Sequence, residues 1–360
     1  MQRMADRYIF ASVLAALLLA ACSGADEPLS DDNGSTVPTD TISYTVAASL
    51  TRSTVIRGTE FPIDESFRVW AFEEDDATLI DGGIVSCTNG LVWSTSEKYY
   101  WPQGDGRVSF FALYPNTLSM DKDTKSFSYV VPGDVSSQQD VLYDAVTAGK
   151  TDDGVSHNPI KRYAVPLTFH HALTQVAFKG CVSANNPEWT VSVSAITLCN
   201  VASRGTFDLT TMKWKGLAGL KDFSVGIRSD AGAFGYASEA IDLTAPDGVL
   251  LMIPQTLRPW DTDDYVVNTY DCYLAIDCHI RQGYIDIIGT ATQPATIYVP
   301  FNDGPTSWKQ GYRYNYTLEF GEGYNAEGER ELQALVVSSE ITDWAEGGDD
   351  DLGAKMTQNE

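Results

Sequence analysis

The sequence predicts an all-β protein built from antiparallel β-sandwiches rather than a barrel. Apolar and polar residues alternate in the segments 189–195, 270–280 and 312–320, as they do in strands that bury one face. Clusters of glycine, aspartate, asparagine and proline, such as residues 81–83, separate these segments, as turns do. The sequence contains no long stretch with the helical period, so we expect strands along most of the chain.

Two further segments, 67–72 and 108–114, are more continuously apolar than the alternating ones. Central strands of a sandwich have this character, so we expect both segments in the middle of a sheet. The segment 42–46 alternates, and it is the predicted first strand.

The first 21 residues read as a secretory signal. Arg3 and Arg7 make the start basic, and residues 9–21 are apolar apart from Ser12. This apolar run is shorter than the roughly 20 residues that a membrane-spanning helix needs. The motif Leu-Ala-Ala-Cys that ends at Cys22 matches the bacterial lipobox, which predicts removal of residues 1–21 and acylation of the Cys22 sulfur and amino group. The alternative is an ordinary signal followed by a chance cysteine.

Residues 22–41 are polar and rich in proline, glycine and serine, which is typical of a flexible tether. The formal net charge of the chain is −25, and such a charge repels nucleic acid and anionic lipid. We therefore expect the protein to stand off the bilayer, held by its acyl chains, and we expect no nucleic-acid partner.

About 320 residues follow the tether. A single hydrophobic core usually supports fewer residues than this, so two domains are expected. A polar interval at 147–162 precedes the strand "AVPLTFHHALTQVAFKG", and we place the boundary near His170. The predicted parts are an N-terminal domain at 42–170, a C-terminal domain at 171–347 and an acidic polar tail at 348–360.

The cysteines after Cys22 are odd in number, so at least one is unpaired. Cys272 and Cys278 lie about 20 Å apart in an extended strand, too far for a mutual disulfide, and we expect buried thiols. A disulfide between Cys181 and Cys199 is left open. Zinc-ligand spacings and CxxC pairs are missing from the sequence.

The sequence lacks the motifs of the common catalytic and metal sites. His170 and His171 are adjacent, so in a strand they point to opposite faces and cannot bind one metal ion together. Neither a Gly-x-Ser-x-Gly elbow nor an Asp-x-Asp-x-Asp-Gly calcium loop occurs. We therefore predict a protein that is no enzyme and uses neither metal nor cofactor.

Trp260, in the polar stretch "RPWDTDD", is the best candidate for stacking on a sugar. The alternative is an aromatic side chain that lines the surface or caps the core.

Three parts of the chain resemble the fimbrillin-like proteins of Bacteroidota, the group of major and minor fimbrium subunits. The first is "YYWPQGDGRVSFFALYP" at 99–115, and the second joins "DVLYDAVTAGK" to "VPLTFHHALTQVAFKG" within 140–180. The third runs from "ITLCNVASRGTFDL" through "LLMIPQTL" and "WKQGYRYNYTLEF" to "EITDWAEGG". Together they cover most of residues 43–347 in the order of the family.

The resemblance implies two transthyretin-like β-sandwich domains and export as a lipoprotein to the outer surface. It also implies that an arginine-specific protease cuts polymerising members near the first strand, which a strand of another subunit then replaces. Arg52 and Arg57 are the candidate cleavage sites, and the alternative is that both are ordinary surface arginines. The segment "LQALVVSSEITDW" is either an exchangeable strand or the last strand of its own domain.

The leading hypothesis is therefore a lipoprotein of the cell outer membrane that serves adhesion as a fimbrium subunit or as an accessory anchor or tip component. Its partners are other fimbrium subunits and a host or bacterial surface receptor. The alternative is a surface lipoprotein that binds glycan for nutrient capture.

Overall fold

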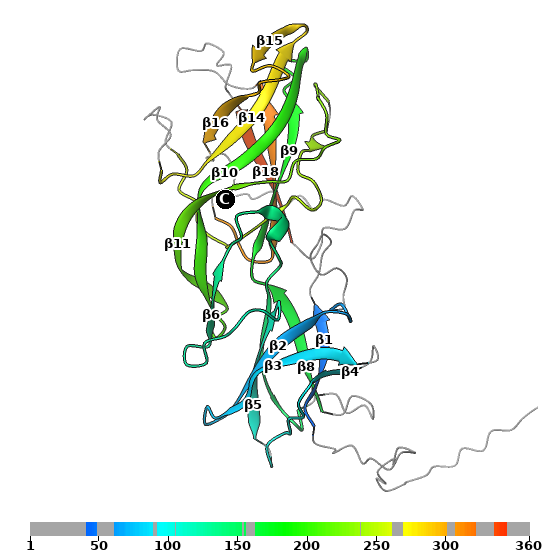
Figure 1. Cartoon of the computed structure of the whole chain (residues 1–360), viewed down its shortest axis with the longest axis vertical. Helices are drawn as coiled ribbons and strands as arrows, with labels where there is room; N and C mark the ends of the chain where they lie inside the picture. The colour runs from blue at the N-terminus through cyan, green and yellow to red at the C-terminus, as the bar shows by residue number, and fades with distance from the viewer. Residues whose placement is uncertain are drawn as a thin grey trace, which may run out of the picture. The chain divides into compact units, whose positions relative to one another are not determined.

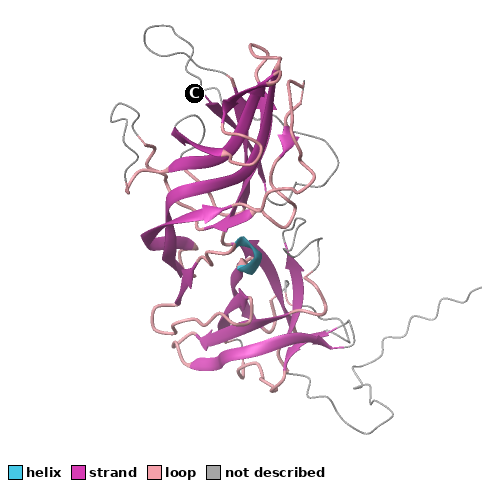
Figure 2. Ribbon diagram, turned by 45° about the horizontal axis from the view of Figure 1, so that its top comes forward, coloured by secondary structure: helices cyan, strands magenta, loops and turns pink. Residues whose placement is uncertain are grey.

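The computed structural model describes residues 41–48, 61–88, 92–104, 106–152, 155, 163–237, 239–260, 269–300, 307–321 and 335–343. Residues 40–360 form one compact unit. The described residues hold strands β1 to β18 and a single 3-10 turn, η1 (Val135–Ser137). Strands dominate the ribbon, where they are magenta (Figure 2). The predicted all-β fold is confirmed.

The first group of strands forms a sheet that closes on itself in the order β1-β4-β3-β2-β5-β7-β8 (Figure 1). Closure occurs where β1, the first strand of the chain, lies between β4 and β8. Its strands are β1 (Ser43–Ala48), β2 (Ser66–Glu73), β3 (Thr78–Thr88), β4 (Val92–Thr95), β5 (Arg107–Tyr114), β7 (Leu142–Gly149) and β8 (Ala164–His171).

Two more sheets follow. The six-stranded sheet has the order β11-β10-β14-β15, with β16 also paired to β14 and β6 to β10. The five-stranded sheet has the order β12-β9-β17-β18, with β13 also paired to β9. The strands are β6 (Ser126–Val130), β9 (Thr174–Val182), β10 (Trp189–Asp208), β11 (Lys213–Ser224), β12 (Ile241–Asp242), β13 (Leu250–Met252), β14 (Tyr273–Gln282), β15 (Ile285–Ile288), β16 (Ala295–Pro300), β17 (Tyr312–Phe320) and β18 (Leu335–Asp343).

The prediction of purely antiparallel pairing needs correction at two places. β1 pairs with β8 in parallel, and β17 pairs with β9 in parallel. The first of these pairs closes the N-terminal sheet on itself, whereas the sequence predicts a sandwich rather than a barrel. Parallel partners need a long connection between them, and both pairs here join strands that are far apart in the chain. Alternation within a strand reports its buried face but neither its neighbour nor the direction of that neighbour.

Alternate residues of β5 belong to two different hydrophobic cores. Val108, Phe110 and Ala112 point into the core enclosed by the closed sheet. Phe111 and Leu113 point the other way, into the core that also contains the buried residues of the two C-terminal sheets. β5 is therefore buried on both faces, which explains why its sequence is continuously apolar.

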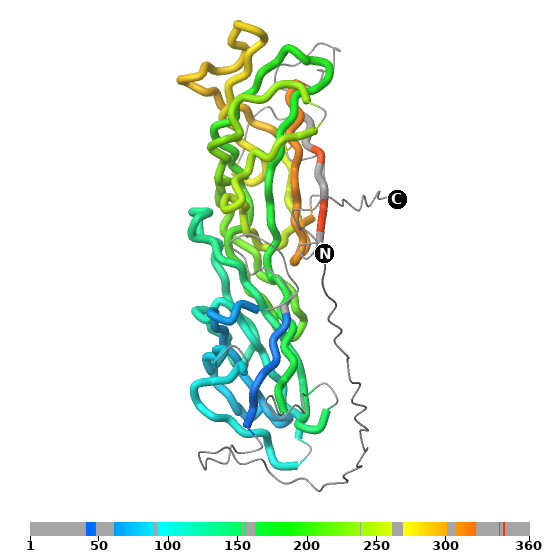
Figure 3. The backbone as a smooth tube through the Cα atoms, turned by 90° about the vertical axis from the view of Figure 1, so that its right-hand side faces the viewer, coloured from blue at the N-terminus to red at the C-terminus, as the bar shows by residue number. Residues whose placement is uncertain are grey.

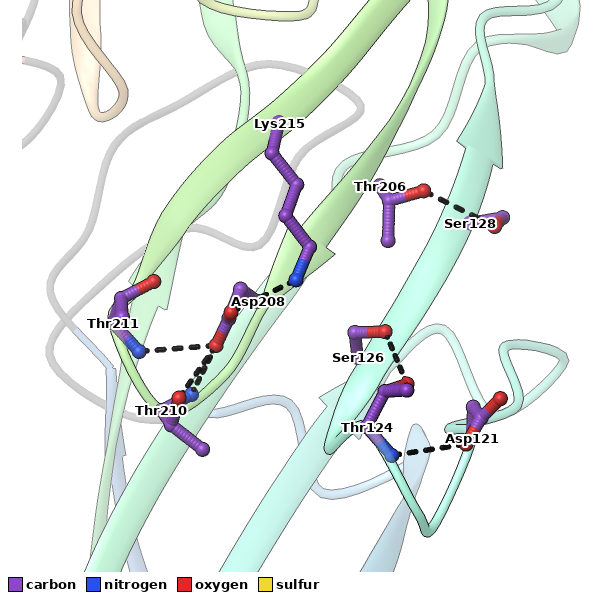
Figure 4. A network of polar contacts seen from close by, with 9 residues as sticks. All are labelled: Asp121, Thr124, Ser126, Ser128, Thr206, Asp208, Thr210, Thr211 and Lys215. Carbon is purple, nitrogen blue, oxygen red and sulfur yellow. Dashed lines mark hydrogen bonds and ion pairs between the residues drawn. The ribbon is translucent and has the colours of Figure 1, made fainter.

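β6 links the first sheet to the second. It lies between β5 and β7 in the sequence, yet it pairs with β10. The ring of Phe127 on β6 packs against Phe207 on β10, with centroids 5.4 Å apart. Figure 4 shows the polar side chains around this pairing. Among them, the carboxylate of Asp208 accepts a hydrogen bond from the backbone N–H of Thr210 at 2.9 Å and forms an ion pair with Lys215 at 3.0 Å. The domain boundary near His170 stays a prediction.

Candidate functional site

The predicted site residues fall in different parts of the structure. Cys22, Arg52 and Arg57 lie outside the described residues. Trp260 is described and lies just before β14. Strand β1, which precedes both arginines in the sequence, is described in full as backbone, so the candidate assembly site is built from β1 and its neighbours.

β1 is paired along both of its edges. Along one edge, every residue from Ser43 to Ala48 pairs with β8. Along the other edge, the described residues pair Tyr44 of β1 with Trp93 of β4, and Thr41 just before β1 bridges Tyr100. The backbone N–H of Ile42 adds one hydrogen bond, to the carbonyl of Tyr99 at 2.8 Å. β1 therefore closes the sheet between β8 and β4, and Figure 3 shows it in blue beside β8.

The inward side chains of β1 follow the predicted alternation. Ile42 and Tyr44 are fully buried, and Ser43 between them is only partly covered. The ring of Tyr44 meets Phe67 and Phe110 edge to face, with centroids 6.3 and 6.2 Å apart. These contacts place the side chain of Tyr44 in the middle of the enclosed core.

An aromatic cluster lies beside these contacts. Phe61 packs against Phe67, Trp93 and Phe169, with ring centroids 5.5, 5.4 and 5.1 Å apart. Loss of β1 would uncover Phe67 and Phe110, and with them the edge of this cluster. Large aromatic rings dominate the energetics of protein cores and interfaces, so an emptied β1 position is strongly apolar.

The hydroxyl group of Tyr44 is buried and has no hydrogen-bond partner in the described part of the chain. Burial, and then the neighbouring Tyr99, raise the pKa of Tyr44 far above its ordinary value. A buried donor without a partner costs about 1–3 kcal/mol. The ring of Tyr44 therefore stabilises the docking of β1 in the sheet, whereas its buried hydroxyl destabilises it.

The last described strand, β18, is the outermost strand of the five-stranded sheet. It pairs with β17 along its whole length, from Tyr312 opposite Asp343 to Phe320 opposite Leu335. Ser338 and Ile341 are exposed. The segment thus occupies a place in its own chain, and its exchange with another subunit stays a prediction.

Trp260 is half-buried and lies against the start of β14. Its backbone N–H donates to the carbonyl of Cys272 at 3.0 Å. Its ring meets Tyr273 edge to face at a centroid distance of 6.2 Å. The sequence identified Trp260 but missed Tyr273, because the contact depends on how the loop returns to the sheet.

The two adjacent histidines face opposite sides of β8, as the sequence predicts. His170 is exposed and its ring lies 5.9 Å from that of Tyr143. His171 is buried, and its Nδ1 lies 2.8 Å from Oδ2 of Asp140, which is also buried. This pair joins the end of β8 to the segment before β7, which is a structural role.

The five described cysteines are free thiols, so the disulfide left open between Cys181 and Cys199 is absent. Burial raises the pKa of Cys199 to about 11 and that of Cys278 to about 12. Among the described residues, no three His, Cys, Asp or Glu side chains gather as metal ligands would. The same residues include no helix long and apolar enough to cross a membrane.

Comparisons with known proteins agree with this architecture. A fimbrial protein from Bacteroides vulgatus has the same fold, with a TM-score of 0.55 and 12% identity over 84% of this chain and 99% of that one. A protein from Bacteroides uniformis that is assigned a role in cell adhesion gives a TM-score of 0.50 and 13% identity over 88% and 100% of the two chains. The fimbrial anchor protein Mfa2 from Porphyromonas gingivalis is a more distant match, with a TM-score of 0.37 and 8% identity over 84% and 98%.

No curated protein sequence matches the chain. The model of the fimbrillin-like family matches residues 51–344, which is most of the chain. With the all-β architecture and the fold shared with a fimbrial protein, this match shows that the chain belongs to the fimbrillin-like family.

Proposed function

We propose that the protein is a fimbrium subunit, or an accessory anchor or tip component, that joins its neighbours at the cell surface by exchange of strand β1. The observation that supports this proposal is the place of β1, which is the first strand of the chain and closes the sheet through a parallel ladder to β8. A strand of this kind can leave without unravelling the antiparallel ladders of the other strands in its sheet.

The groove left by β1 would attract another strand. Its walls are the unpaired backbone groups of β8 and the rings of Phe67 and Phe110. Main-chain hydrogen bonds supply affinity in such additions, and pockets for alternate side chains supply specificity. The incoming strand would run parallel to β8 and place apolar side chains where Ile42 and Tyr44 lie.

Cleavage after Arg52 or Arg57 is the proposed trigger. Both arginines follow β1 directly in the sequence, so a cut at either one separates β1 from the rest of the sheet. Acylation of Cys22 is the proposed attachment to the outer membrane, and it would be lost from the mature subunit together with β1. An uncut protein would keep its anchor, which suits an anchoring component.

The test is treatment of the full chain, purified in detergent, with an arginine-specific protease. We expect loss of the N-terminal segment and a ladder of oligomers on a denaturing gel run without boiling. Arg52→Lys and Arg57→Lys keep the positive charge but remove the cleavage sites, so they serve as matched controls, singly and together. Cut protein that stays monomeric, or a ladder that persists in the double variant, would refute exchange of β1 after cleavage.

A second candidate function is the capture of glycans at the cell surface. The contact between Trp260 and Tyr273 favours it, because an aromatic pair at a surface is a common platform for sugars. Loss of selective glycan binding in Trp260→Ala would support this role, and unchanged binding would contradict it.

A further inference from the structure

The outer face of β10, β14 and β16 has a regular arrangement of side chains. These strands lie next to one another in the six-stranded sheet (Figure 1). Ala275 on β14 lies between Thr197 on β10 and Tyr298 on β16. One pair further along, Asp277 lies opposite Thr296. Residues directly opposite in paired strands share a face, so these side chains form one surface.

This face is open to solvent, unlike its reverse. Ala275 and Asp277 are partly exposed, and Tyr298 is 48% exposed. Their neighbours along β14, Leu274 and Ile276, are fully buried in the second core. The sheet therefore buries one face and presents the other as a free surface.

Three aromatic rings lie in a row on this face, and we call them the aromatic platform: Trp260, Tyr273 and Tyr298. Tyr273 meets Trp260 at a centroid distance of 6.2 Å and Tyr298 at 5.9 Å, both edge to face. The contacts hold each ring in a defined orientation before any ligand arrives, which lowers the entropic cost of binding. Burial is the main cause that raises the pKa of Tyr273, with Cys199 and Asp222 adding to it, so its phenol stays neutral.

Polar groups suited to hydroxyl ligands lie beside the platform. Oδ1 of Asp277 accepts a hydrogen bond from Thr296 Oγ1 at 2.5 Å, and its other carboxylate oxygen makes none within the described part of the chain. The hydroxyl oxygens of Thr197 and Ser224 lie 2.8 Å apart, and either hydroxyl can donate the hydrogen bond. Ala275, between Thr197 and Tyr298, carries only a methyl group on this face.

The charges near the platform select against anions. Asp222 accepts the backbone N–H of Asn200 at 3.0 Å and lies near Tyr273. Asp271 is paired with Arg258 at 2.6 Å. With Asp277, the charged groups around the platform are mainly carboxylates, in a chain whose net charge is −25. An anionic ligand would be repelled, whereas a ligand with neutral hydroxyl donors finds acceptors here.

We propose that the aromatic platform and Asp277 bind neutral oligosaccharides of pyranose sugars. A pyranose ring has an apolar face that stacks on an aromatic ring and hydroxyls that donate to a carboxylate. A dry protein interface fits less well, because it would bury the open carboxylate oxygen of Asp277 without a donor. The site is separate from β1, so this inference does not depend on the proposed assembly role. It rests on the second candidate function, glycan capture, and deepens it by naming the sugar class and adding Tyr298 and Asp277 to the site.

The test uses the full chain, purified in detergent, on an array of neutral, sialylated and sulfated oligosaccharides, followed by calorimetry with the neutral hexasaccharide that binds best. We expect binding to neutral glycans alone. Tyr298→Ala should raise the Kd about tenfold, which corresponds to about 1.4 kcal/mol, because it removes one ring of the platform. Asp277→Asn should weaken binding with little change in the fold, because the amide retains an acceptor but replaces the open carboxylate oxygen.

Tyr284→Ala is the matched control. Tyr284 lies at the turn between β14 and β15, is fully exposed and touches no ring of the platform, so its loss should leave the Kd unchanged. The inference is overturned if no neutral glycan binds, if sialylated or sulfated glycans bind as well as neutral ones, or if Tyr298→Ala binds like the wild type. Each variant should still form protease-dependent ladders if assembly uses β1. The ladders therefore test strand exchange and the glycan Kd tests the platform, so one proposal can fail while the other holds.

Discussion

Replacing Tyr44 with phenylalanine should strengthen the hold of β1. The substitution removes the buried hydroxyl that has no partner in the described residues and keeps the ring that packs against Phe67 and Phe110. The side chain is 0% exposed, so the variant places no new group in water. Tyr44→Ala is the opposite perturbation, because it removes the ring as well.

The sizes of the two effects follow from burial. An unsatisfied buried hydroxyl costs about 1–3 kcal/mol, and we expect Tyr44→Phe to recover about 1 kcal/mol of that. Loss of a whole buried aromatic side chain costs about 3–5 kcal/mol, so Tyr44→Ala should weaken β1 severely. A gain of about 1 kcal/mol slows the local opening of β1 about fivefold.

Native-state hydrogen exchange measures this opening directly. We expect the amides of β1 to exchange about fivefold more slowly in Tyr44→Phe than in the wild type, with amides of β10 unchanged as an internal reference. Urea unfolding should show the same sign. Faster exchange of β1 in Tyr44→Phe would refute the reasoning, because it would mean that the hydroxyl has a stabilising partner.

Three more predictions concern the core, pH and the thiols. Phe207→Ala should lower the free energy of unfolding by about 3–5 kcal/mol in urea, because the ring is fully buried against Phe127 and its loss leaves a cavity. Hydrogen bonds from Thr210 and Lys215 hold the pKa of Asp208 below its usual range, so its stabilisation is present at neutral pH and lost as the pH falls well below about 3.9. The urea midpoints of wild type and Asp208→Asn should therefore converge in acid. Cys199, with its pKa raised to about 11, should react with a thiol reagent only after unfolding.

Each of these has a contradicting result. A loss below about 1 kcal/mol in Phe207→Ala would mean that the site collapses around the missing ring. A stability difference for Asp208→Asn that is constant with pH would remove the role of its charge. Rapid labelling of Cys199 in the native protein would show that its strand opens readily.

Local structure was predictable because alternation is a property of single strands. The periods in 189–195 and 312–320 correspond to strands β10 and β17, and the continuous run at 108–114 corresponds to β5. The parallel pairing of β17 with β9 was not predictable, since the sequence pattern of a strand says nothing about a partner far along the chain. The crossing of β6 was missed for the same reason.

The candidate sites were predictable to a similar extent. The segment 42–46 was identified as the first strand from its alternation, but its pairing with β4 and β8 emerges only from the closed sheet. Trp260 stood out as an aromatic residue in a polar loop. Its neighbours Tyr273 and Tyr298 did not, because each belongs to a strand whose register with the other depends on the whole sheet.

The crossing of β6 has a mechanical consequence. The chain passes between the closed sheet and the C-terminal sheets by way of the segments on both sides of β6, and again between β8 and β9. Gln138 adds a tie, because its Oε1 accepts the backbone N–H of Leu251 at 2.7 Å. Tension applied to the closed sheet is therefore shared among these three covalent connections and the β6–β10 ladder. Several hydrogen bonds of that ladder must break at the same time before β6 separates from β10. The protein should therefore resist stretching better than two domains that are joined by a single linker.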